Sequence, residues 1–293
     1  MANSTPVRRP DTPRLAFPAL ILANVVLAFG PTLVRLADVG PVAAGFWRLA
    51  IALPFLLLLS RRSLMAARLS IWQWTAMIVA GLFFAADLGT WHAGIHLTKV
   101  ANSTLFGNVS ALVLPIWAVF VLGQRLRRLQ MLALALAAAG AAILMAGSYE
   151  LAPRYLRGDL LCLLAGLFYA AYLLLVQDAR QRLDGWSVLT VASLAGVLPL
   201  LLTALAMGER VLPGDWTPVI ALALSSQLIG QGLMTYAIGW FSPLVLGLSL
   251  LLQPAVAALL GWMLFGETMS VTDGVGAIAV GAALVLVRLP ARP

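Results

Sequence analysis

Charge and reactive side chains are scarce in this sequence. Only 10% of its 293 residues are charged, whereas a soluble domain carries about 25%. It has one cysteine, Cys162, so an intrachain disulfide is excluded. The two histidines, His92 and His96, share one short segment and are too few to complete a zinc site. We find no carboxylates at metal-binding spacing and no nucleophile elbow, so we expect no enzyme, metal or cofactor.

Hydrophobic residues dominate instead, at 62% of the chain with a mean hydropathy of +0.97. A soluble core could not bury so much apolar surface, so the lipid bilayer must be the solvent. We therefore expect an all-α polytopic membrane protein and keep the first apolar run as a span, not a cleaved signal peptide. Runs of about 20 apolar residues predict ten transmembrane helices, near 15–37, 41–60, 72–97, 100–122, 129–147, 158–178, 186–207, 216–239, 242–265 and 272–289.

The positions of the basic residues predict the orientation. With the N-terminus inside the cell, the cytoplasmic loops and termini carry thirteen arginines, and the outer loops carry four arginines and one lysine. Cytoplasmic loops are enriched in such residues, so we expect both termini in the cytoplasm and the chain in the inner (plasma) membrane. We expect the net charge of +8 to face membrane lipids. No basic segment is interleaved with aromatic residues, so we expect no nucleic-acid partner.

Short sequence segments of the first half recur in the second half at a nearly constant spacing. "LPFLLLL" at 53–59 returns as "LPLLLTA" at 198–204, "WTAMIVAG" at 74–81 as "WTPVIALA" at 216–223, and "LGQRL" at 122–126 as "FGETM" at 265–269, with offsets of 145, 142 and 143. The spacing predicts two five-helix repeats, 1–148 and 149–293. An odd number of spans inverts the second repeat, a construction found in secondary transporters. Duplication for folding alone is the alternative.

Ionisable residues cluster in the third predicted span. Asp87 and Trp91 share one arc of the helix with Thr90 and Gly94, whereas His92, His96 and Lys99 lie on a different arc. A charge inside a span is costly unless it faces a cavity or a partner. Asp87 therefore either lines a cavity, binding an ammonium group or carrying a proton, or is a structural carboxylate paired with Arg48 or Arg35. His92 has a similar alternative, as a hydrogen-bonded residue packed between helices.

Uncharged amides occur at helical spacing in other spans. They are Asn108, Gln227, Gln231 and Gln253, and they suit a zwitterionic or sugar-like ligand because they offer donors and acceptors without a fixed charge. Hydrogen bonding between helices is the alternative. Tyr169 and Tyr172, at i and i+3, could form an aromatic wall, or they simply pack in the core. The fifth and tenth spans are rich in small residues and predict a scaffold or a homodimer contact.

The segments "ADLGTWHAGIHLTKVANSTLFGNVSALVLPIW" and "LLQPAVAALLGWMLFGE" resemble EamA-type members of the drug/metabolite transporter superfamily. The resemblance extends over essentially the whole chain, although Gln124 stands where the family often has glutamate. It implies a ten-helix fold that exports small metabolites by alternating access. Within the superfamily the chain resembles YddG-type exporters of aromatic and other neutral amino acids.

We therefore expect a secondary transporter that exports small neutral metabolites, foremost aromatic and other neutral amino acids. The alternatives are a multidrug exporter of lipophilic cations and a carrier of nucleotide sugars or other metabolites. Phosphorylated substrates favour several buried cations, and only Arg48 lies well within a span. The predicted substrate-binding residues are Asp87, Trp91, His92, Asn108, Tyr169, Gln227, Gln231 and Gln253.

Overall fold

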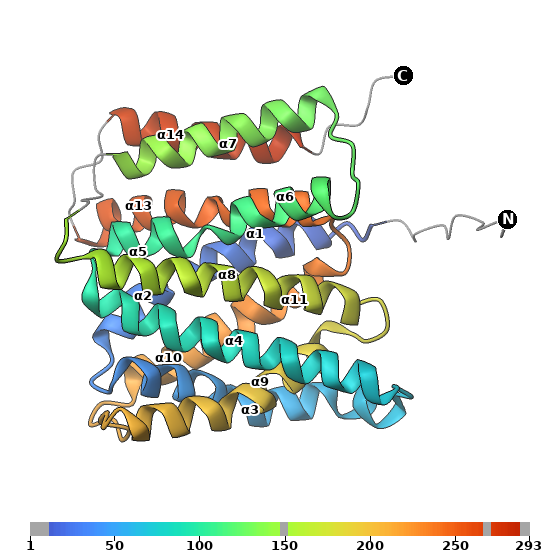
Figure 1. Cartoon of the computed structure of the whole chain (residues 1–293), viewed down its shortest axis with the longest axis vertical. Helices are drawn as coiled ribbons and strands as arrows, with labels where there is room; N and C mark the ends of the chain where they lie inside the picture. Colours follow the sequence, from blue (N-terminus) through green and yellow to red (C-terminus); the bar gives the residue numbers. More distant parts are fainter. Residues whose placement is uncertain (1–11, 147–151, 266–270, 288–293) are drawn as a thin grey trace, which may run out of the picture.

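The computed structural model describes residues 12–146, 152–265 and 271–287, and these ranges contain helices and no strand. The predicted junction at 148–149 and the loop at 266–270 lie outside them. Figure 1 shows the helices stacked in layers. They are α1 (Ala16–Leu27), α2 (Gly30–Leu36), α3 (Pro41–Ala66), α4 (Ile71–Leu97), α5 (Val100–Gly107), α6 (Ser110–Phe120), α7 (Arg128–Ala146), α8 (Leu156–Ala179), α9 (Gly185–Ala206), α10 (Thr217–Leu222), the π-helix η1 (Ala223–Gln231), α11 (Gly232–Ile238), α12 (Pro243–Leu250), α13 (Leu252–Phe265) and α14 (Val271–Leu286).

Among the described residues, seven helical segments are long and apolar enough to cross a membrane. They are Ala16–Leu36, Pro41–Ala66, Ile71–Leu97, Asn102–Phe120, Leu156–Ala179, Gly185–Ala206 and Thr217–Ile238. Three shorter apolar helices, Arg128–Ile143, Pro243–Val256 and Gly274–Leu286, fall in the fifth, ninth and tenth predicted spans. The all-helical, multi-pass architecture is thus confirmed, whereas the count of ten spans stays a prediction.

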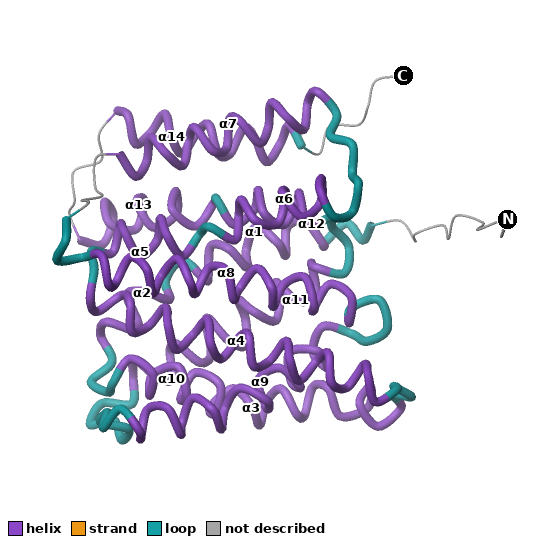
Figure 2. The backbone as a smooth tube through the Cα atoms, viewed as in Figure 1, coloured by secondary structure: helices purple, strands orange, loops and turns teal. Residues whose placement is uncertain are grey.

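Helices from the two halves of the chain pack against each other in pairs. α3 lies along α9, α4 along α8, α6 along α12, and α7 along α14. α1 packs on η1 and α11. In the predicted repeat, η1 and α11 correspond to α4, and α8 corresponds to α1. Exchanging the halves therefore leaves the pattern of partners unchanged. Figures 1 and 2 show α7 and α14 together as one outer layer; the homodimer contact expected of these helices stays a prediction.

Glycines permit the close approaches that place α8. A Cβ on Gly166 of α8 would lie 2.5 Å from the backbone oxygen of Gly107, at the end of α5. A Cβ on Gly94 of α4 would lie 2.5 Å from Sγ of Cys162, also on α8. Small residues allow membrane helices to approach closely and gain van der Waals contact. α8 is thereby held against both α4 and the α5–α6 connection.

Several predicted spans are interrupted halfway. α1 ends at Leu27, four residues before Pro31, and α12 ends at Leu250, four residues before Pro254. Proline cannot donate to the carbonyl four residues earlier and its ring collides with that carbonyl, so the helix breaks there. A third interruption, at Asn108 and Val109, separates α5 from α6. Three of the predicted spans are therefore each built from two consecutive helices.

A polar latch ties the start of α3 to the loop after α9. The carboxylate of Glu209 accepts hydrogen bonds from the backbone N–H groups of Val42 (3.3 Å) and Ala43 (2.8 Å). The backbone N–H of Gly40 donates to the Arg210 carbonyl at 2.9 Å, and Nε1 of Trp47 donates to a carbonyl in the same loop. First-turn N–H groups lack partners within their own helix, and a carboxylate also complements the helix dipole. The latch therefore fixes the start of α3, which carries Arg48.

We expect Glu209→Ala to lower the melting temperature of the detergent-purified protein, measured by differential scanning fluorimetry. Losing a helix-capping side chain costs about 0.5–2 kcal/mol. Arg210→Gln is the matched control, because it removes only exposed contacts, an ion pair with Asp38 and a hydrogen bond from Nε to the Leu212 carbonyl, and exposed ion pairs contribute little. Equal melting temperatures for the two variants would contradict this role of Glu209.

Candidate functional site

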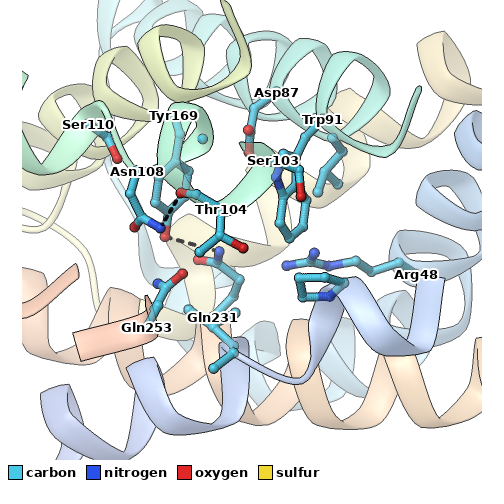
Figure 3. A pocket seen from close by; sticks show the side chains of 15 residues that line it. Arg48, Asp87, Trp91, Ser103, Thr104, Asn108, Ser110, Tyr169, Gln231 and Gln253 are labelled. Carbon is cyan, nitrogen blue, oxygen red and sulfur yellow. Dashed lines mark hydrogen bonds between the residues drawn. The ribbon is translucent and has the colours of Figure 1, made fainter. Parts of the chain in front are cut away.

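A cavity lies where the interrupted helices meet. It comprises about 700 Å³ of empty space, with open solvent included. Its walls come from both halves of the chain (Figure 3). The lining residues are Leu27, Ala28, Pro31, Arg48, Asp87, Leu88, Trp91, Ser103, Thr104, Gly107, Asn108, Ser110, Tyr169, Gln231 and Gln253.

The breaks in the helices supply much of this lining. Leu27, Ala28 and Pro31 surround the α1–α2 break, and Gly107, Asn108 and Ser110 surround the α5–α6 break. Gln253 follows the break between α12 and α13. Irregular backbone at membrane depth is tolerated where it is covered by protein or lines a cavity. Discontinuous helices around a central site are also characteristic of secondary transporters.

Two opposite charges reach the cavity from neighbouring helices. Arg48 of α3 is 3% exposed and Asp87 of α4 is 9% exposed. Nε of Arg48 donates to Oε1 of Gln227 at 3.1 Å, and its guanidinium lies 5.8 Å from the centre of the Phe84 ring. Within the described part of the chain the two charged groups form no direct ion pair. Figure 3 shows the guanidinium pointing into the cavity from the side opposite Asn108 and Gln253.

Amides form the other polar part of the wall. Nδ2 of Asn108 donates to the Thr104 carbonyl at 2.8 Å, and Nε2 of Gln253 donates to Oδ1 of Asn24 at 3.0 Å. Nε2 of Gln231 donates to the Tyr169 hydroxyl at 3.3 Å. Oε1 of Gln231 is buried and has no hydrogen-bond partner among the described residues. A buried acceptor of this kind suggests a missing partner, such as water or a ligand.

Aromatic rings complete the wall. The Trp91 indole lies close to two backbone positions without side chains, since a Cβ on Gly107 would lie 3.0 Å from its Nε1 and one on Gly30 3.7 Å from its ring. Tyr169 stacks on Tyr172 with ring centres 5.8 Å apart, and Tyr172 stacks on Phe84 at 4.6 Å. The glycines thus leave room for the indole, and the stack fixes Tyr169.

The structure brings six of the eight predicted residues to this cavity: Asp87, Trp91, Asn108, Tyr169, Gln231 and Gln253. The other two lie behind the wall. Nδ1 of the buried His92 lies 3.0 Å from the Pro41 carbonyl, and its Nε2 has no partner among the described residues. Gln227 is fully buried and connects Arg48 with Ser193.

Sequence reasoning considered Arg48 as a partner for Asp87 and as the one buried cation available to a phosphorylated substrate, and did not place it among the binding residues. Its signal was nonetheless present, because it is the one arginine well within a predicted span. Arg35, the other proposed partner of Asp87, instead donates to the carbonyls of Ile95 and Thr98 at the end of α4. Ser103, Thr104 and Ser110 were also missed as lining residues, because small hydroxyl residues are common in membrane helices for packing alone.

We expect cysteines placed in the cavity wall to react with a small, charged thiosulfonate. In a Cys162→Ala background, Thr104→Cys and Ser110→Cys should be modified, because both positions line the cavity. Ser60→Cys is the control for Ser110→Cys, since Ser60 is as buried as Ser110 but lies outside the cavity. Mass spectrometry of the intact protein measures the modification. Equal labelling of Ser110→Cys and Ser60→Cys would show that reagent does not enter this cavity.

Comparison with known proteins agrees with this architecture. The model of the EamA-like transporter family matches residues 15–146 and again residues 156–289. An uncharacterized transporter of Archaeoglobus fulgidus is 26% identical over 206 residues, which cover 70% of this chain and 73% of that protein. A crystal structure with 20% sequence identity superposes with a TM-score of 0.74 over 94% of this chain and 95% of the other, and so shares its fold. The two matches of the family model together span nearly the whole sequence, and the chain therefore belongs to the EamA-like transporter family.

Proposed function

We propose that the protein exports small neutral metabolites, foremost aromatic and other neutral amino acids, across the inner (plasma) membrane. The observation that carries this proposal is the composition of the cavity wall, where the Asp87 carboxylate and several amides lie near aromatic rings. A neutral amino acid offers a matching set of groups: an ammonium, a carboxylate and an apolar side chain. Membership of a transporter family supports movement of this ligand through the membrane.

Each part of the wall has a role in this proposal. The Asp87 carboxylate attracts the ammonium group by charge and hydrogen bonding. Gln231, Gln253 and Asn108 provide polar contacts without adding net charge. Trp91 and Tyr169 accept the substrate side chain, because flat rings stack favourably on one another.

Alternating access supplies the mechanism. The cavity is shared by both halves of the chain, and the packing partners are unchanged when the halves are exchanged. Two inverted five-helix repeats with this internal exchange symmetry could open the same site first to one face and then to the other. Both termini would lie in the cytoplasm. The breaks in the helices lie beside the proposed substrate site, where the backbone could bend during this change.

Export of lipophilic cations is the second candidate, favoured by the buried Asp87. Arg48 opposes it, because a guanidinium in the same cavity repels a cationic substrate. Nucleotide sugars are less well matched, since Arg48 is the one cationic side chain that lines the cavity within the described residues. Phosphate groups are commonly bound by several cationic side chains or backbone N–H groups.

The proposal is tested by counterflow into liposomes that contain the purified protein. Labelled phenylalanine, threonine, a lipophilic cation and a nucleotide sugar are compared, and protein-free liposomes give the background. We expect saturable counterflow of phenylalanine and threonine without an imposed proton gradient. Flux of the lipophilic cation alone, dependent on a pH gradient, would replace this proposal by the drug-exporter alternative.

Trp91→Ala should discriminate between substrates. We expect the KM for phenylalanine to rise by about 2–10-fold, since an aromatic pair contributes about 0.5–1.5 kcal/mol, while the KM for threonine changes less. Trp72→Ala is the control, because Trp72 is 80% exposed on the outside of the bundle. Equal changes for phenylalanine and threonine would argue against a stacking role for Trp91.

A further inference from the structure

Both cavity charges have hydrogen-bonding capacity left over. Nε of Arg48 is occupied by Gln227, but neither of its terminal nitrogens bonds to a described residue. The Asp87 carboxylate accepts no hydrogen bond from a described residue either. Both side chains line the cavity. The two opposite charges attract each other, but buried charges are costly unless they are also hydrogen-bonded, and a ligand in the cavity could supply those hydrogen bonds to both groups.

The guanidinium of Arg48 is held in a fixed orientation. Gln227 accepts from its Nε and in turn donates from Nε2 to the Ser193 hydroxyl at 3.0 Å. Both of these residues are fully buried. The Phe84 ring supports the guanidinium from another direction. An arginine restrained in this way presents its terminal N–H groups as a planar fork, a geometry that matches the two oxygens of a carboxylate.

We infer that Arg48 binds the substrate carboxylate and Asp87 binds the substrate ammonium, so that the cavity selects zwitterionic α-amino acids. This inference rests on the proposed function and refines it. A ligand with both charges satisfies both side chains at once without requiring a direct ion pair between them. An amine leaves the Arg48 charge without a partner, and a carboxylic acid leaves Asp87 without one.

Gln227 then acts as a positioning residue. It lies behind the wall and does not line the cavity, but its bond to Nε sets the plane of the Arg48 fork. Losing it should weaken binding of ligands that carry a carboxylate and leave a simple amine unaffected. A purely structural role would weaken both kinds of ligand alike.

The test is displacement of labelled phenylalanine from the purified protein in detergent. The competitors are unlabelled phenylalanine, 2-phenylethylamine, which lacks the carboxylate, and 3-phenylpropionate, which lacks the ammonium. For the unaltered protein we expect each of the two single-charge ligands to bind at least about 30-fold more weakly than phenylalanine, as when one member of a buried charged pair is removed. An amine that competes as well as phenylalanine would overturn the inference.

Variants assign the two ends of the ligand. Arg48→Gln should lose about 30-fold or more in phenylalanine affinity without weakening 2-phenylethylamine binding, and Arg48→Lys should recover part of the loss. Asp87→Asn should weaken 2-phenylethylamine and spare 3-phenylpropionate. Gln227→Leu should narrow the difference in affinity between phenylalanine and 2-phenylethylamine. Arg210→Gln, which removes an exposed arginine outside the cavity, should match the unaltered protein throughout.

The outcomes separate this inference from the proposed function. Counterflow of phenylalanine with unchanged affinity in a folded Arg48→Gln variant would overturn the inference and leave amino-acid export standing. Absence of phenylalanine binding and counterflow in the unaltered protein would overturn both. Where a variant does not fold, as judged by size-exclusion chromatography, the ranking of the three ligands on the unaltered protein decides the question.

Discussion

Backbone hydrogen bonding inside a lipid bilayer constrains this structure more than any other interaction. Every N–H and C=O group at membrane depth needs a protein partner, and a continuous helix satisfies these groups within one segment. Where a helix is interrupted, its unpaired backbone groups must therefore be covered by protein or lie beside a polar cavity. The breaks after Leu27, before Ser110 and after Leu250 converge on one cavity, so the same irregularities that the bilayer disfavours define the site.

The same reasoning applies to side chains. Polar groups behind the cavity wall are used in pairs or chains, such as Arg48–Gln227–Ser193 and Ser249–Asn24–Gln253. Each chain joins a first-half helix to a second-half helix and ends at a residue of the cavity lining. The buried network thus packs the two halves together and orients the groups that face the cavity.

The sequence could predict the helical architecture because apolar runs and the bilayer thickness determine it almost alone. It could also place Asp87 and Trp91 together, since helical periodicity puts them on one arc of α4, and the structure finds both in the cavity wall. Periodicity does not say which arc faces the cavity and which faces another helix. Gln227 and Gln231 lie one turn apart in η1, yet only Gln231 reaches the cavity. That distinction depends on tertiary packing, as do the breaks near Asn108.

The two halves have kept matching residues in the scaffold and have diverged at the cavity. Arg35 caps the carbonyls at the end of α4, and Arg180, 145 positions later, caps those at the end of α11 through Thr235 and Tyr236. The position 145 residues after Arg48 is instead Ser193, which supports the network of Arg48 rather than supplying a second guanidinium.

The two cavity charges therefore both belong to the first half, on the adjacent helices α3 and α4, whereas Gln231 and Gln253 belong to the second. Duplication alone would give each half its own arginine and carboxylate at the cavity, whereas the described lining from the second half is uncharged. Divergence at the cavity leaves one charge of each sign. A movement of one half against the other would carry the pair as a unit, so that a zwitterion could keep its charged contacts while its contacts with the second-half residues Tyr169, Gln231 and Gln253 change.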